Sequence, residues 1–194
     1  MKNLRYFAIA AAAMLFSSCD DEDGFYNETY IDLANLVQIE AEPSYSVGDY
    51  LTVRTDFSRF QPEPGFETPL DIYETTSGAP GFLFSYMLEK ETSPGVWQPL
   101  ELTGAQVEVF DGSVQLASYI LATAAYDASD ETYEYNAGIL LSSTGNYRLS
   151  FGLNSDSTNK IELRSRTQGN NLFLNINSTT TQLNGQGYYT FTVN

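Results

Sequence analysis

Histidine is absent from this chain of 194 residues, and cysteine occurs once, at Cys19. Without histidine the chain lacks the usual general base, the serine–histidine and cysteine–histidine pairs of nucleophilic enzymes, and imidazole ligands for zinc. A lone cysteine excludes an intramolecular disulfide. Carboxylate chemistry is left, but among 25 acidic residues no pair stands out as catalytic. We therefore predict that the protein is not an enzyme and needs no cofactor.

Basic residues are also scarce, since 9 Lys and Arg stand against 25 Asp and Glu. Removal of an N-terminal segment that contains Lys2 and Arg5 would leave 7 basic residues and a formal charge of −18. A surface this acidic repels phosphate backbones, whose binding depends on Lys and Arg. The composition therefore excludes nucleic acid as a partner.

The apolar run at residues 7–16 is too short to span a membrane, because its ten residues are half of the ~20 that a spanning helix needs. Because the basic residues Lys2 and Arg5 precede it, such a run predicts a cleaved signal peptide at residues 1–18. Ser17, Ser18 and Cys19 resemble the lipobox of bacterial lipoproteins. The resemblance implies that Cys19 is lipidated and anchors the protein to a membrane. Alternatively, Cys19 is the last residue of an ordinary secretory signal.

Four acidic residues follow Cys19 directly, namely Asp20, Asp21, Glu22 and Asp23. The run resembles the export signal of Bacteroidota lipoproteins, which implies a place in the outer leaflet of the outer membrane, facing the medium. Like charges also repel one another, so the run equally fits a solvated, extended tether. We expect residues 19–30 to form a lipidated flexible tether and residues 31–194 to form one domain.

The rest of the chain shows the patterns of β-strands. Residues 36–41 and 50–57 alternate apolar and polar side chains, as half-buried strands do. Residues 116–126 are the one stretch that fits a short helix. Further predicted strands cover residues 82–90, 96–100, 105–110, 113–117, 132–141, 146–153, 160–166, 171–176 and 187–193. Many short strands with glycine-rich turns predict an all-β fold, an antiparallel sandwich or barrel, of which we favour the sandwich.

Two segments resemble immunoglobulin-like and fibronectin-like domains. Residues 139–151 contain Gly145, Asn146 and Tyr147, in the pattern in which a tyrosine after a glycine opens a late strand. Residues 47–53 carry a Val-Gly-Asp sequence before an early strand. The resemblance implies an immunoglobulin-like β-sandwich in which the Tyr147 hydroxyl bonds back to the corner backbone. No cysteine pair joins the sheets, so the domain is not of the antibody type.

One acidic segment invites a metal interpretation. Asp127, Asp130 and Glu131 offer the carboxylate oxygens that calcium prefers. The segment lacks the spacing of a dedicated calcium loop, and we favour a solvated loop without metal.

Aromatic residues are plentiful, with 14 Tyr and 12 Phe, and exposed rings on a sandwich can stack against sugars. Trp97, beside a turn, is expected to close one end of the core. The candidates for exposed, ligand-binding rings are Tyr126, Tyr133, Tyr135, Tyr188 and Tyr189.

Two functions fit these patterns. The first is a non-catalytic cell-surface lipoprotein that binds a glycan or a protein partner at the outer membrane. The alternative is a structural or assembly lipoprotein of an outer-membrane complex with no small-molecule ligand.

Two further segments have open interpretations. Residues 56–80 are either a functional loop or a covering flap. Ser157, in an Asp-Ser-Thr sequence, matches a Bacteroidota O-glycosylation pattern, and an exposed turn is expected there.

Overall fold

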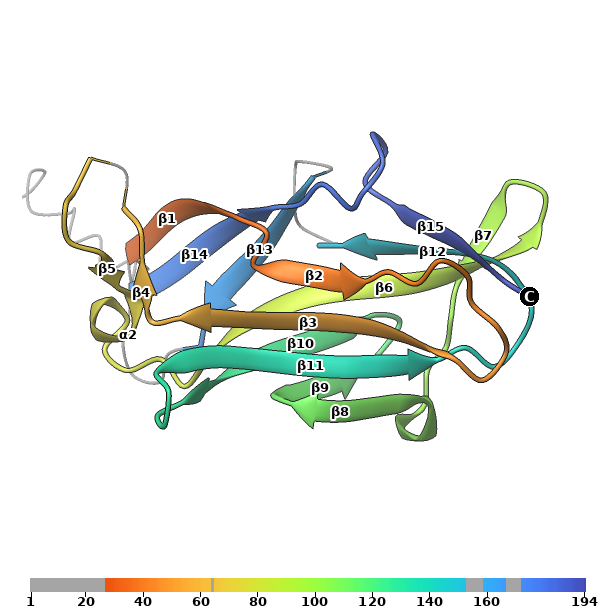
Figure 1. Ribbon diagram of the computed structural model, residues 1–194, viewed down its shortest axis with the longest axis horizontal. Helices are drawn as coiled ribbons and strands as arrows, with labels where there is room; N and C mark the ends of the chain where they lie inside the picture. The colour runs from red at the N-terminus through yellow and green to blue at the C-terminus, as the bar shows by residue number, and fades with distance from the viewer. Residues whose placement is uncertain (1–26, 64, 153–158, 167–171) are drawn as a thin grey trace, which may run out of the picture.

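A computed structural model describes residues 27–63, 65–152, 159–166 and 172–194. Apart from a four-residue helix and one 3-10 turn, the elements within these ranges are β-strands, so the all-β prediction is confirmed (Figure 1). The elements are β1 (Asn27–Ala34), β2 (Val37–Glu40), β3 (Tyr50–Ser58), β4 (Phe60–Gln61), β5 (Leu70–Asp71), α2 (Ile72–Thr75), β6 (Gly81–Ser93), β7 (Val96–Pro99), η1 (Gly104–Gln106), β8 (Val107–Asp111), β9 (Ser113–Leu116), β10 (Ile120–Asp127), β11 (Thr132–Leu140), β12 (Gly145–Phe151), β13 (Lys160–Ser165), β14 (Leu172–Thr179) and β15 (Tyr189–Val193).

Thirteen of these strands form one mixed, strongly curled sheet. Its main path runs β1-β14-β13-β6-β10-β11-β3-β2, and β12, β15, β7, β8 and β9 branch from it. The prediction of an antiparallel immunoglobulin-like sandwich needs correction on two points. The β1–β14 pair is parallel, and the two sides of the core belong to one hydrogen-bonded sheet because β10 pairs with both β6 and β11.

Strand β6 is the centre of the branching because its 13 residues are long enough for four neighbours. Its first half pairs with β10 and β13, and its second half pairs with β12 and β7. Its inward side chains Phe82, Phe84, Tyr86 and Leu88 are all buried. Each such side chain contributes about 1.5–3 kcal/mol by leaving water. The long apolar alternation therefore explains why this strand lies across the core.

The curled sheet encloses one hydrophobic core. On β11 the buried hydrophobic side chains are those of Tyr133, Tyr135, Ala137 and Ile139, while the side chains between them face outward. The two-residue period of a strand produces this alternation. Strands β2, β3, β10, β12, β13 and β14 contribute their inward residues in the same way.

Strands β10 and β11 pair with each other only near the turn that joins them, and beyond it they separate into two arms. Gly112 lies where they separate. Beyond the shared pairs, β10 pairs with β9 and β11 pairs with β8. Gly112 joins β8 to β9 with a φ of 75°. A Cβ atom there would lie 2.3 Å from the Thr123 carbonyl oxygen, so only glycine fits.

The suggested helix at residues 116–126 is not formed, because β10 occupies most of this segment. Ile120, Ala122 and Ala124 face the core at alternate positions. Pairing with strands on both edges satisfies the backbone of this segment, and this outweighs the helix preference of alanine.

The tyrosine corner that the resemblance implied is present. The Tyr147 hydroxyl donates a 2.7 Å hydrogen bond to the Ser143 carbonyl oxygen. Gly145, between them, has a φ of 137°, which favours glycine.

Residues 56–63 and 65–80 lie over one end of the core, as a covering flap does. The chain leaves β3, passes through β4 and β5, and enters α2 with Ile72 and Thr76 fully buried. Asp71 caps α2 by accepting hydrogen bonds from the backbone N–H groups of Tyr73 and Glu74.

Candidate functional site

The outer face of β7, β6, β12 and β15 brings together two aromatic rings and an ion pair. On β12, Tyr147, Leu149 and Phe151 face the core, so Arg148 faces outward. Its guanidinium carbon lies 4.7 Å from the centroid of the Trp97 ring and 4.0 Å from that of the Tyr188 ring.

Arg148 is fixed by a bidentate bond to Glu89, the residue opposite it on β6. The two hydrogen bonds to the carboxylate measure 2.6 and 3.0 Å. The Glu89 side chain is only 8% exposed although it points outward, and that of Arg148 is 20% exposed. The hydrogen bond to Glu89 raises the pKa of Arg148, so the guanidinium stays charged. We call Trp97, Arg148, Tyr188 and Glu89 the arginine face.

A second polar row borders the arginine face. The Asn146 amide donates a 2.7 Å hydrogen bond to Glu91, and the Thr192 hydroxyl donates a 2.9 Å hydrogen bond to the Asn146 carbonyl oxygen. The hydrogen bonds from Asn146 and from the Gly95 backbone lower the pKa of Glu91. The outer face therefore offers aromatic surface beside ordered donors and acceptors.

The expectation that Trp97 closes the core is wrong, because Trp97 is half-buried on β7 and packs on Arg148. Arg148 was missed as a site residue. Its outward position could be inferred from the alternation of β12, but its neighbours come from two distant parts of the chain, the β6–β7 pair and the segment before β15. Only strand pairing shows that they meet.

Tyr133 and Tyr135 are not exposed candidates, because their rings are 0% and 1% exposed. They face the core on β11, where the Tyr135 hydroxyl lies 2.6 Å from the Tyr86 hydroxyl. Tyr126 is partly buried and stacks on Tyr73 with 4.3 Å between ring centroids. The alternation with Glu134 and Asn136 along β11 was the available signal that these tyrosines point inward. Tyr188 and Tyr189 are half-buried.

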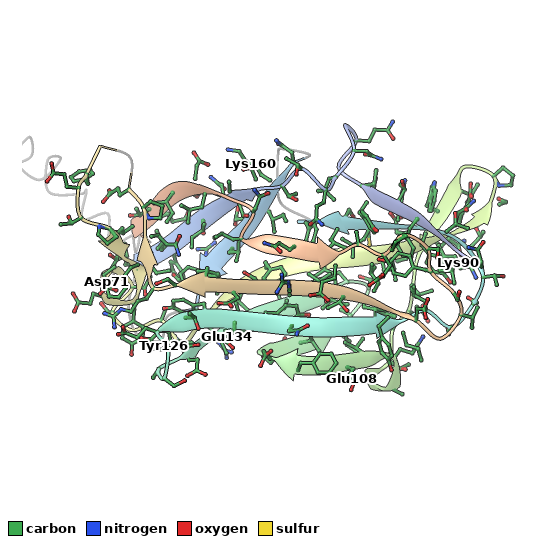
Figure 2. All side chains as sticks on the ribbon, in the orientation of Figure 1. Asp71, Lys90, Glu108, Tyr126, Glu134 and Lys160 are labelled. Carbon is green, nitrogen blue, oxygen red and sulfur yellow. The ribbon has the colours of Figure 1, made fainter. Side chains whose placement is uncertain are left out.

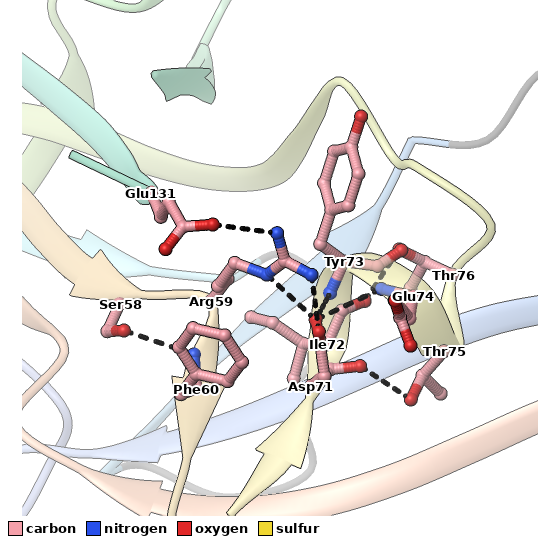
Figure 3. Close-up of polar contacts among 10 residues, drawn as sticks. All are labelled: Ser58, Arg59, Phe60, Asp71, Ile72, Tyr73, Glu74, Thr75, Thr76 and Glu131. Carbon is pink, nitrogen blue, oxygen red and sulfur yellow. Dashed lines mark hydrogen bonds and ion pairs between the residues drawn. The ribbon is translucent and has the colours of Figure 1, made fainter. Parts of the chain in front are cut away.

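A second ionic cluster lies at the flap (Figure 3). Arg59 bonds Asp71 through two nitrogens and Glu131 at 3.0 Å. These hydrogen bonds lower the pKa of the Asp71 carboxyl, mainly through Arg59. The guanidinium also lies over the rings of Phe60 and Tyr73. Because every charge in this cluster has a partner, its role is to attach the flap to the β10–β11 turn.

The proposed metal ligands do not all meet. Asp127, Asp130 and Glu134 offer carboxylate oxygens within 4.8 Å of one another, but Glu131 points away and pairs with Arg59. Three carboxylates at this distance are chemically able to hold a hard cation such as calcium. Asp127 and Asp130 are exposed, in keeping with the solvated loop that we favour.

Glu134 lies on β11, close to the carboxylates of Asp127 and Asp130 (Figure 2). A hydrogen bond from Thr132 lowers its pKa, but partial burial and the charges of Asp130, Asp56 and Asp111 outweigh that bond. The net effect is a raised pKa for Glu134.

Cys19, the acidic run at residues 20–23 and Ser157 lie outside the described residues. Among the residues that are described, no helix has the length and apolar character to cross a membrane. No protein-family model, curated protein or solved structure matches this chain.

Proposed function

We propose that this protein is a non-catalytic lipoprotein of the bacterial outer membrane that binds a glycan through the arginine face. The observation that carries the proposal is Arg148, which contacts Trp97 and Tyr188 while Glu89 holds its guanidinium. Sugar rings have apolar C–H faces and polar hydroxyl edges. Aromatic rings beside fixed, charged hydrogen-bonding groups complement both.

The fixed geometry of the arginine face favours binding. A side chain that is already ordered loses little conformational entropy when a ligand arrives. Arg148 is ordered by its bidentate bond and its two ring contacts, and Asn146 is held between Glu91 and Thr192. This arrangement serves recognition, and the absence of histidine supports a role without catalysis.

The proposed location depends on the lipobox-like motif at Cys19 and the acidic residues after it. Figure 1 shows β7 and β15 at the end of the molecule away from the start of β1. Residues 27–30, which we expected in the tether, are part of β1 and pair with β14, so a tether would end before residue 27. On an anchored protein the arginine face would lie at the end of the domain opposite the start of β1. Mass spectrometry of the mature N-terminus and surface proteolysis of intact cells test the anchor and its side.

A glycan array probed with the purified protein tests the binding function. We expect reproducible hits that Trp97→Ala and Tyr188→Ala both abolish. The matched control is Phe110→Ala, which removes an exposed ring from a different part of the surface and is expected to keep the hits. A blank array, or hits that survive Trp97→Ala in a folded protein, would refute the proposal.

The assembly function is a second candidate, favoured by one specific observation. The edge strand β8 exposes apolar side chains and has a partner strand on one side only among the described strands. Such an edge is a site for pairing with another polypeptide.

A further inference from the structure

Strand β8 is unusually open for a strand of a folded domain. Four of its five residues are exposed, and they include Val109 at 38% and Phe110 at 58%. Within the described part of the chain, β8 pairs only with β11, and a register shift opposite Asn136 and Ala137 leaves Phe110 without an opposite residue. One edge of its backbone is therefore free to accept another strand.

The chain around this edge is acidic, and among the described residues Glu131 is the one carboxylate of this segment that has an ion-pair partner. Residues 91–147, which include β7 to β11, contain eight Asp and Glu and no Lys or Arg. Glu108 and Asp111 on β8 form no ion pair with any described residue. Figure 2 shows Glu108 on β8 and Glu134 on the neighbouring β11.

These charges select among possible occupants of the edge. A second copy of this chain would place Glu108 and Asp111 against equally acidic residues, and like charges across a strand pair are destabilising. The acidic residues 20–23 make the chain's own N-terminal segment an equally poor occupant. A segment that carries Lys or Arg would gain attraction instead.

We propose that the free edge of β8 binds an extended, basic segment of a partner protein as an added strand. The backbone of β8 would supply the hydrogen bonds, and Phe110 would supply apolar contact. Glu108 and Asp111 would pair with the basic side chains of the incoming strand. This binding is independent of the glycan proposal, since it uses a different part of the sheet.

An eight-residue peptide of alternating lysine and valine is a direct probe. We expect it to bind the purified protein at least tenfold more tightly than a peptide of equal charge in which two central valines are replaced by proline. Proline removes backbone donors and prevents strand pairing but leaves the charge unchanged. Hydrogen–deuterium exchange is expected to slow at residues 107–111 when the lysine–valine peptide is bound.

Two variants localise the effect. The double substitution Glu108→Lys with Asp111→Lys is expected to weaken peptide binding at least tenfold, whereas Glu42→Lys with Glu67→Lys makes the same change of net charge elsewhere and should weaken it far less. If the Glu108→Lys, Asp111→Lys double variant fails to fold, Phe110→Ser replaces it, and it should also weaken peptide binding although it changes no charge. Trp97→Ala is expected to bind the peptide normally, which separates this test from the glycan test.

Three results would overturn the proposal. The first is equal affinity for the proline peptide, which would show that charge alone attracts the probe. The second is slowed exchange elsewhere with β8 unaffected. The third is a dimer of this chain that protects residues 107–111 without any peptide.

Discussion

The buried hydroxyl pair of Tyr86 and Tyr135 allows a sharp test of the core. The two oxygens lie 2.6 Å apart, both side chains are about 1% exposed, and each hydroxyl has the other as its hydrogen-bond partner. Removing one hydroxyl leaves the other buried without a partner, which costs about 1–3 kcal/mol. We therefore expect Tyr86→Phe and Tyr135→Phe each to lower the free energy of unfolding by that amount. Removing both hydroxyls leaves no unpaired group, so the double variant is expected within about 1 kcal/mol of the parent protein.

Urea denaturation followed by circular dichroism measures these free energies, provided that all variants unfold in a single transition. Tyr50→Phe is the control, since Tyr50 is 42% exposed and its change should stay within about 0.5 kcal/mol. The reasoning predicts that the double variant is more stable than either single one. A double variant that loses the sum of the two single losses would show that the hydroxyls do not depend on each other.

Three further predictions concern a glycine and two carboxylates. Gly112→Ala is expected to cost at least about 2 kcal/mol more than Gly95→Ala in thermal or urea unfolding, because both glycines have positive φ but a Cβ atom meets other atoms within 4 Å only at Gly112. Equal costs would mean that backbone strain alone matters there. The pKa of Asp71 is lowered in the folded protein. The ionised carboxylate therefore stabilises the fold above the pKa of the unfolded state, and this stabilisation is lost as the pH falls through the pKa of the folded state. Asp71→Asn should destabilise the protein at pH 7 and much less in acid. Glu134 has a raised pKa, so its ionisation destabilises the fold as the pH rises, and Glu134→Gln should stabilise the protein at pH 7 with a gain that vanishes near pH 4. Stability curves between pH 3 and 7 check both signs, and a gain for Glu134→Gln that persists in acid would contradict this assignment.

Much of the fold could be predicted because strand patterns are local. The alternation of side chains in β3 and β12 is visible in the sequence, and the turn before Tyr147 identified the corner correctly. Tyr133 and Tyr135 alternate with polar residues in the same way, but we predicted exposed rings from the aromatic content, and the structure buries both. The alanine-rich segment of β10 was ambiguous because its local preference is for helix, and only its neighbours on both edges make it a strand.

The candidate site could not be predicted because it depends on non-local pairing. Trp97, Arg148 and Tyr188 come from segments some forty or fifty residues apart. They meet because β7 and β12 both pair with β6 and because β15, which follows Tyr188, pairs with β12. Glu131 shows the same limit, since its sequence neighbours are acidic but the folded chain places it against Arg59.

The sequence by itself determined the chemical character of this protein: an acidic β-rich chain without histidine, with one cysteine and with side chains that alternate along its strands. These properties follow from residue identity and from the two-residue period of an extended backbone. The tertiary structure alone decided that the strands join in one curled sheet, that Gly112 lies where two arms separate and that Arg148 lies against two aromatic rings. The reason is that register and branching depend on which distant strands satisfy one another's hydrogen bonds while burying a common core.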